Sequence, residues 1–369
     1  MLDHDYMKLA LTLARSAKGQ TSPNPNVGAV VVKNGEIIGM GAHLKAGGPH
    51  AEVHAIRAAG ERVKGADIYV TLEPCSHYGK TPPCADLIID SGIKRVVIAS
   101  VDPNPLVAGK GIEMLKASGI QVDVGICEKE ALELNEPFFH FIQTNTPYVT
   151  LKAAASFDGK TAAKTGDSKW ITSPESRLQV HQLRNEHDAI LTGVNTVIHD
   201  NPLLTARLPQ GGKNPIRVIL DSHLKIPMDA NVIQDKSAKT IIFTRSDADV
   251  KKAEEIANCG AEIIFLEERI SIDKVLKELG KKNIMTLLVE GGSEIHSSFI
   301  EHDAFNQMIL YLAPVIIGGK SAPSVVGGNG IDWMRQAKKL TFVSSEPIGP
   351  DIKIVAKPIK EERNVYGNH

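Results

Sequence analysis

Four residues in the first quarter of the chain have the types and spacing of a catalytic zinc site. His50 and Glu52 form a His-x-Glu pattern, and Cys75 and Cys84 follow further along the chain. One imidazole and two thiolates are the ligands of a catalytic zinc whose fourth position holds water. The metal lowers the pKa of this water to about 7, and a nearby carboxylate can pass its proton to a leaving amine. The pattern is typical of zinc-dependent base deaminases, in which the Glu is not a ligand, and it predicts Glu52 as the proton shuttle.

The spacing of the two cysteines departs from the general deaminase pattern. Eight residues separate Cys75 from Cys84, where base deaminases usually have two. The intervening segment carries His77 and Lys80, and a purely structural loop has little need of both.

A closed structural zinc site is the main alternative for the same residues. His54 or His77 would then be the fourth ligand, and His54 lies one helical turn from His50. A structural site does not call for a carboxylate at position 52, so we favour the catalytic interpretation. Cys127 and Cys259 have no ligand-like neighbours in the sequence and are expected to be ordinary buried thiols.

Helical and strand patterns alternate around these residues, which predicts a three-layer α/β domain over residues 1–146. His50 and Glu52 stand at the start of a helix expected from Ala51, Cys75 follows a strand, and Cys84 opens the next helix. Helix N-termini favour the thiolate form of cysteine. The expected helices are 6–17, one from 51, 85–91 and 112–118, and the expected strands are 27–32, 36–41, 68–72, 95–99 and 121–124.

Turn-forming residues and a proline at 143–147 place a domain boundary there, and a second α/β domain is expected over 147–369. Its short apolar strands alternate with helices, which predicts a mostly parallel sheet of the kind that binds nucleotide cofactors. The expected strands are 148–154, 189–191, 217–220, 240–243, 262–266 and 285–289, and the expected helices are 174–185, 250–258 and 272–279.

Composition bounds the class of protein. The chain has 369 residues, 42% hydrophobic and 23% charged, as globular proteins do, and its formal net charge is −1. This near-neutral charge argues against a nucleic-acid partner, although a few cations suffice for a small phosphorylated substrate. The sequence has no run of 18 apolar residues and no basic secretory leader, so we expect no membrane association. Four cysteines make no disulfide framework, which favours the cytoplasm.

Three motifs together resemble the bifunctional deaminase–reductase family of riboflavin biosynthesis. They are Thr-Ser-Pro-Asn-Pro-Asn-Val-Gly at 21–28, His-Ala-Glu at 50–52, and Glu-Pro-Cys-Ser-His at 73–77 continuing to Pro-Cys at 83–84. The resemblance covers almost the whole chain, and the eight-residue cysteine spacing is specific to this family among deaminases. It implies a cytidine-deaminase-like first domain with one Zn²⁺ and a dihydrofolate-reductase-like second domain that uses NADPH.

The resemblance also implies a reaction sequence and substrate contacts in the first domain. The family deaminates 2,5-diamino-6-ribosylamino-4(3H)-pyrimidinone 5′-phosphate and then reduces the ribosyl chain to ribityl. By resemblance, the zinc ligands are His50, Cys75 and Cys84, with Glu52 as proton donor. The substrate contacts map onto Asn24, His43, His77 and Lys80. Asn24 offers both an acceptor and a donor to a pyrimidine edge, and its alternative role is that of a turn residue between two prolines.

A glycine pair supplies the strongest local signal in the second domain. Leu-Leu-Val-Glu-Gly-Gly-Ser-Glu at 287–294 reads as a buried strand that turns into a helix N-terminus, where phosphate binds readily. The sequence is not Gly-x-Gly-x-x-Gly, so the standard dinucleotide fingerprint is absent. Alone, such a pair is more often plain turn chemistry than a nucleotide site.

The family resemblance assigns the remaining contacts of the second domain. It implies NADPH contacts at Ala154, Trp170, Thr196, Asp200, Ser222, Gly292, Ser293, Glu294, Ile295, His296, Ser297 and Ser298. It implies contacts with the reductase substrate at Ser168, Arg184, Leu204, Arg207 and Glu290. The guanidinium groups of Arg184 and Arg207 suit a phosphate, and without the family each would be read as a surface ion pair. Asp200, Glu290 and Lys152 are candidates for the acid that protonates the new hydroxyl, and the sequence does not rank them.

Three other readings stay open on the sequence alone. The second domain could be a non-catalytic oligomerisation or regulatory domain, the first could act on tRNA adenosine, or the zinc could stabilise a binding module without catalysis. Fused biosynthetic enzymes of this kind often associate, so we expect a homo-oligomer.

Overall fold

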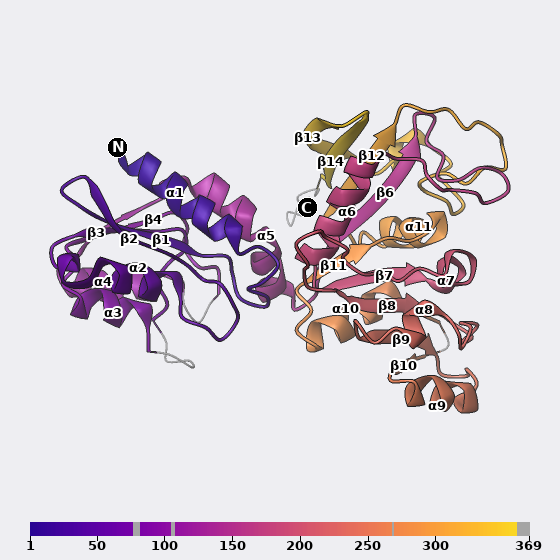
Figure 1. The fold of residues 1–369 in the computed structure, drawn as a ribbon, viewed down its shortest axis with the longest axis horizontal. Helices are drawn as coiled ribbons and strands as arrows, with labels where there is room; N and C mark the ends of the chain where they lie inside the picture. The colour runs from indigo at the N-terminus through magenta and orange to yellow at the C-terminus, as the bar shows by residue number, and fades with distance from the viewer. Residues whose placement is uncertain (77–81, 105–107, 268, 360–369) are drawn as a thin grey trace, which may run out of the picture. The chain divides into compact units, whose positions relative to one another are not determined.

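The computed structural model describes residues 1–76, 82–104, 108–267 and 269–359 (Figure 1). The chain divides into two compact units. The first comprises Met1–Thr146 with Asn283–Met285, and the second comprises Pro147–Lys282 with Thr286–His369. None of the helices in the described ranges is long and apolar enough to cross a lipid bilayer.

The first unit has a five-stranded sheet in the order β2-β1-β3-β4-β5. The hairpin of β1 and β2 and the pair of β1 and β3 are antiparallel, whereas β3, β4 and β5 are parallel. Its strands are β1 Gly28–Lys33, β2 Glu36–Ala42, β3 Asp67–Val70, β4 Arg95–Ile98 and β5 Gln121–Val124, and its helices are α1 Asp3–Ser16, α2 Ala51–Ala59, α3 Cys84–Asp90, α4 Lys110–Ala117 and α5 Glu128–Thr144.

Helices cover both faces of this sheet, with α1 and α5 on one side and α2, α3 and α4 on the other (Figure 1). The strand period of two sends alternate side chains to opposite faces. Val31 of β1 therefore belongs to the core under α2 and α3, whereas Val30 belongs to the core under α1. This confirms the expected three-layer arrangement. The long helix α5 was not among the expected elements.

Helix α2 packs against β2 at very short range. A Cβ at Gly41 would lie 2.4 Å from the carbonyl oxygen of Ala51, so only glycine lets the helix approach this closely. Because His50 and Glu52 stand at the N-terminal end of α2, this packing fixes their position over the sheet.

The second unit has a nine-stranded sheet in the order β10-β9-β8-β7-β11-β6-β12-β14-β13. All neighbouring strands from β10 through β12 in this order pair in parallel. Strands β14 and β13 follow β12 and pair antiparallel. The mostly parallel sheet expected from the sequence is confirmed. The strands are β6 Tyr148–Ser156, β7 Ala189–Gly193, β8 Ile216–Leu220, β9 Thr240–Arg245, β10 Glu262–Leu266, β11 Thr286–Val289, β12 Gln307–Ala313, β13 Leu340–Ile348 and β14 Asp351–Pro358.

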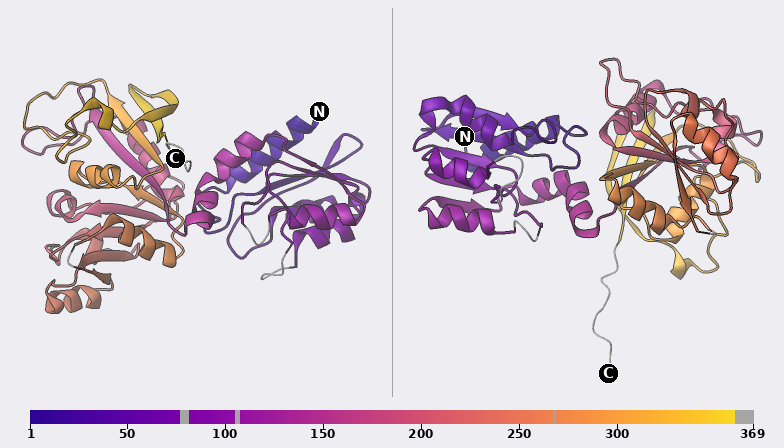
Figure 2. Two further views of the ribbon diagram at one scale, coloured as in Figure 1. Left: turned by 180° about the vertical axis from the view of Figure 1, so that it is seen from behind. Right: turned by 90° about the horizontal axis from the view of Figure 1, so that it is seen from below.

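The central strands β7 and β11 are buried along their whole length, which explains their mostly apolar sequences. Helices lie on both faces of the sheet (Figures 1 and 2). These helices are α6 Pro174–Glu186, α7 Val194–Asp200, α8 Asn231–Gln234, α9 Val250–Asn258, α10 Ile272–Lys281 and α11 Ser293–Glu301.

Candidate active sites

The predicted zinc ligands come together from the starts of two helices and from the segment after one strand of the first unit. His50 is the N-cap of α2, Cys75 lies beyond the end of β3, and Cys84 is the first residue of α3. The ligand atoms of the three residues all lie within 4.8 Å of one another. His50 Nδ1 is 3.2 Å from Cys84 Sγ and 3.6 Å from Cys75 Sγ. A tetrahedral zinc with ordinary bonds to sulfur and nitrogen needs such ligand atoms about 3.5 Å apart, so the donor set fits the ion.

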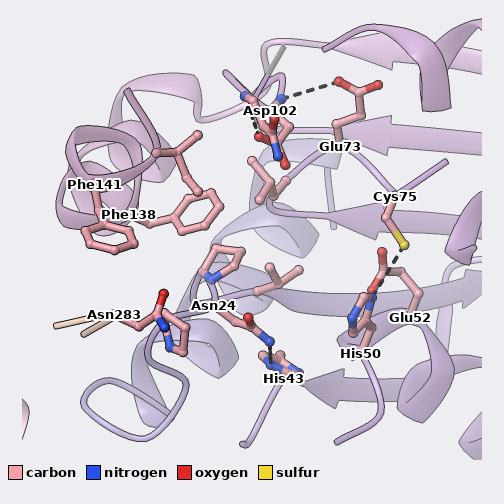
Figure 3. Close-up of a pocket in the computed structure, with 16 residues that line it drawn as sticks. Asn24, His43, His50, Glu52, Glu73, Cys75, Asp102, Phe138, Phe141 and Asn283 are labelled. Carbon is pink, nitrogen blue, oxygen red and sulfur yellow. Dashed lines mark hydrogen bonds between the residues drawn. The ribbon is translucent and has the colours of Figure 1, made fainter. Parts of the chain in front are cut away.

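Glu52 is placed beside this cluster but outside it (Figure 3). The side chain is buried, and its Oε2 atom has no hydrogen-bond partner among the described residues. Burial raises the pKa of the Glu52 carboxyl. A hydrogen bond from Cys84 and another with His50 lower the pKa of the Cys75 thiol, which favours the thiolate that a metal needs. An unpartnered carboxylate oxygen next to an open metal position is placed to exchange protons with water or substrate.

The cluster opens into a cavity of about 380 Å³. Asn24 and His43 line it, and Asn24 Nδ2 lies 3.1 Å from His43 Nε2. His43 Nδ1 lies 3.1 Å from the carbonyl oxygen of Pro49 and must donate, because a carbonyl only accepts. In the neutral ring Nε2 then accepts from Asn24, and burial lowers the pKa of His43, which favours that neutral form. His77 and Lys80 lie outside the described residues.

Sequence reasoning missed several residues of this cavity. Asp102 and Asn104 follow β4, and Phe138 and Phe141 of α5 form an apolar wall (Figure 3). The polar residues after a parallel strand were a readable signal. The aromatic wall was not, because α5 lies far from the zinc motifs in sequence.

The buried carboxylate of Glu73 holds Asp102 and the start of α4 in place. It accepts backbone N–H bonds from Asp102 at 3.3 Å, Gly109 at 3.0 Å, Gly111 at 2.9 Å and Ile112 at 3.3 Å. Glu73 belongs to the quoted motif, but its partners are more than 25 residues away and could not be read from it.

The structure corrects one expectation about the other cysteines. Cys127 does have ligand-like neighbours, because ligand atoms of His4 and Glu130 lie within 4.8 Å of its sulfur and of one another. The chain folds α1 onto α5, which brings these residues together from opposite ends of the first unit. Cys127 is buried, whereas Cys259 is only partly buried.

In the second unit, three of the predicted residues meet in one charged cluster. Arg184 of α6 forms a paired interaction with Glu290, with Nε 2.7 Å from Oε1 and Nη2 2.9 Å from Oε2. Lys152 of β6 lies 3.6 Å from Glu290 Oε2. Arg184 also donates to the carbonyl oxygen of Thr205, and Arg207 donates to the Thr205 hydroxyl. The loop that carries Leu204 and Arg207 is therefore held against the cluster.

Protonation differs sharply within this cluster. Burial alone would raise the pKa of Glu290, but the charges of Arg184 and Lys152 outweigh it and bring the pKa to about 2. Burial lowers the pKa of Lys152. Glu290 is therefore an anion at neutral pH, and its charge opposes the effect of burial on Lys152.

The predicted cofactor residues follow the carboxyl ends of neighbouring strands. Ala154 lies near the end of β6, Thr196 and Asp200 in α7 after β7, and Ser222 two residues after the end of β8. Gly292 is the N-cap of α11, and Ser293, Glu294, Ile295, His296, Ser297 and Ser298 are its first residues. The side chains of His296 and Ser297 are buried. Trp170 is exposed, with the Arg177 guanidinium 4.6 Å from its ring centroid, and Ser168 lies in the same loop.

Fold and site together define a zinc deaminase domain joined to a nucleotide-dependent reductase domain. Residues 1–100 match the family model of the cytidine and deoxycytidylate deaminase zinc-binding region, and residues 147–354 match that of the RibD C-terminal domain. The chain belongs to the RibD family of bifunctional deaminase–reductases of riboflavin biosynthesis, which use zinc and NADPH. Because both catalytic domains are present, the reading of the second domain as non-catalytic is not retained.

Relatives match along their whole length. The riboflavin biosynthesis protein RibD of Bacillus amyloliquefaciens is 54% identical over 100% of both chains, and that of Escherichia coli K12 is 40% identical over 95% of this chain and 98% of its own. The solved structure of Acinetobacter baumannii RibD has a TM-score of 0.88 at 38% identity, covering 97% of this chain and 99% of its own. A Thermotoga maritima diaminohydroxyphosphoribosylaminopyrimidine deaminase/5-amino-6-(5-phosphoribosylamino)uracil reductase has a TM-score of 0.86 with the same identity and coverage.

Proposed function

We propose that this chain deaminates 2,5-diamino-6-ribosylamino-4(3H)-pyrimidinone 5′-phosphate and then reduces the ribosyl side chain to give 5-amino-6-ribitylaminouracil 5′-phosphate. The observation that carries the proposal is the cluster of His50, Cys75 and Cys84 beside the unpartnered Oε2 oxygen of Glu52, next to a cavity of about 380 Å³. A small pyrimidine nucleotide fits this class of cavity.

For the deamination, His50, Cys75 and Cys84 would hold the zinc, which would supply an activated water. Glu52 Oε2 takes the proton of the attacking water and returns it to the departing amino nitrogen. The Asn24 amide donates to His43, which leaves its carbonyl oxygen to accept from the substrate. His77 and Lys80 are further proposed substrate contacts, and Lys80 supplies a cation for the phosphate.

For the reduction, Lys152 is the proposed proton donor. NADPH supplies the hydride, and the alcohol oxygen that forms needs a proton. Glu290 is ionised at neutral pH because its pKa is about 2, and Asp200 lies exposed at the end of α7. Lys152 is largely buried, and its amine lies 3.6 Å from the Glu290 carboxylate, whose charge favours the protonated amine.

The remaining reductase contacts orient the two reactants. Ser168, Arg184, Leu204, Arg207 and Glu290 contact the substrate. Arg207 suits its phosphate, because a guanidinium offers paired donors, whereas Arg184 is paired with Glu290. Ala154, Trp170, Thr196, Asp200, Ser222 and residues 292–298 hold NADPH along the carboxyl ends of the strands.

We also propose that the enzyme is a homo-oligomer that acts in the cytoplasm without a nucleic-acid partner. The edge strand β13 is exposed along almost its whole length and carries apolar side chains, with Phe342 75% exposed and Val343 54% exposed. A second copy would cover this edge. Four free thiols suit a reducing compartment, and the net charge of −1 gives no attraction to a polyanion.

Mass analysis of the products tests the two-step proposal. Purified enzyme with the diaminopyrimidine nucleotide alone should replace one amino group by oxygen, and addition of NADPH should then add two hydrogens. Absence of the first change contradicts the deaminase assignment, and absence of the second contradicts the reductase assignment. For the oligomer, Phe342→Glu should lower the mass measured by light scattering, whereas an unchanged mass excludes this edge as the interface.

A further inference from the structure

The proposed cofactor contacts lie in a row along one edge of the sheet, and the strand next to this row ends in an arginine. They follow the carboxyl ends of β11, β7 and β8, which are adjacent parallel strands in that order (Figure 1). Ligands of open parallel sheets bind across such ends. The next strand is β9, and its last residue is Arg245. A dinucleotide bound along this row extends past Ser222, and the end that extends past Ser222 reaches Arg245.

Arg245 lies directly beside Ser222. Its backbone N–H donates to the carbonyl oxygen of Ser222 at 3.4 Å, and the parallel pairing of β8 with β9 leads into this contact. Its side chain is 29% exposed, so part of it lies at the surface.

The donors of Arg245 are used incompletely, unlike those of the two other arginines described in this unit's core. Arg184 and Arg217 each donate from Nε and both terminal nitrogens. Arg245 donates from Nη2 to Asp247 at 2.5 Å, but its buried Nε has no partner among the described residues. A buried donor without a partner costs free energy unless a ligand satisfies it.

We propose that Arg245 binds the 2′-phosphate of NADPH, with Ser222 beside it, and thereby selects NADPH over NADH. The inference rests on the proposed position of the cofactor. The 2′-phosphate is the only chemical difference between the two nucleotides, and the planar guanidinium matches phosphate oxygens with paired donors. Without the cofactor, Asp247 orients the guanidinium of Arg245. The phosphate then accepts from the N–H groups of Arg245 that do not donate to Asp247.

Nucleotide binding to the full-length protein tests this, with dissociation constants for NADPH and NADH measured by fluorescence. Arg245→Gln should weaken NADPH binding by about 10- to 100-fold, the value of a lost charged hydrogen bond, and should leave NADH binding unchanged. Arg245→Lys should lose less than Arg245→Gln because it keeps the charge. Lys239→Gln is the matched control, since Lys239 is an exposed cation just before the amino end of the same strand.

A second variant separates phosphate binding from a structural ion pair. Asp247→Asn should keep or tighten NADPH binding if the phosphate uses Arg245. If Arg245 only anchors the loop, Asp247→Asn and Arg245→Gln should weaken both nucleotides alike, and this result overturns the proposal. Unchanged NADPH binding in Arg245→Gln also overturns it. Failure of the wild-type protein to bind either nucleotide contradicts the proposed reductase site instead.

Discussion

The two active sites of this chain differ in how their polar groups are satisfied. In the first unit, three ligand atoms converge without a counter-charge, and Glu52 Oε2 has no partner in the described structure. In the second unit, Glu290 is paired with Arg184 and Lys152 in a buried cluster. The first site is thus complete only with its metal, whereas the second is electrostatically balanced by the protein itself. The difference predicts that metal, mutation and pH will affect the two activities separately.

Removal of zinc should separate the two activities most strongly. Chelation should abolish deamination because the ligands alone activate no water, while reduction of the already deaminated substrate continues. Metal analysis of the untreated protein should give one zinc per chain. Cys127→Ser should not change that number, and a fall in zinc content would show that the cluster of His4, Cys127 and Glu130 also holds metal.

Glu52→Gln should lower the rate of deamination by about 10²- to 10⁴-fold, as expected for loss of a general acid–base. The amide keeps the shape of the side chain, so zinc content and reductase activity should match the wild type. Deamination at the wild-type rate would remove Glu52 from the proposed mechanism.

Glu290→Gln should instead destabilise the second unit, by about 3 kcal/mol, because it leaves two buried cations without their counter-charge. Glu346→Gln is the control, since its pair with Lys353 is half-exposed and is worth less than about 1 kcal/mol. The ordinary pKa of 4.5 falls to about 2 in the folded protein. The stabilisation by Glu290 is therefore complete above pH 4.5 and is lost as the pH falls toward 2, and denaturant titrations should show this loss in the wild type but not in the variant.

The smallest effect concerns the pH profile of the reductase. Because burial lowers the pKa of Lys152 and its protonated form is the proposed acid, kcat should fall as the pH rises through a pKa below the ordinary 10.5. Deamination should show no such loss at the same pH. A reductase profile that keeps its shape in Lys152→Arg, whose side chain stays protonated, would argue against Lys152 as the donor.

The zinc motif was readable from the sequence because its chemistry is local. His50 and Glu52 share one helix start, and the two cysteines flank one loop, so residue type and spacing already predict three ligands and a carboxylate. The alternation of apolar segments likewise predicted both sheets. Strands β12, β14 and the edge strand β13 were missed, and β13 is almost fully exposed and lacks a clear buried face.

Other features were decided by tertiary structure. The cluster of Lys152, Arg184 and Glu290 joins residues from β6, α6 and the end of β11, and neither their pairing nor the low pKa of Glu290 is encoded in any local pattern. The same holds for the wall of Phe138 and Phe141 and for the neighbours of Cys127. Sequence spacing determines which groups share a helix end or a loop. Packing of distant elements determines which charges meet in a region shielded from water, and that shielding sets their protonation.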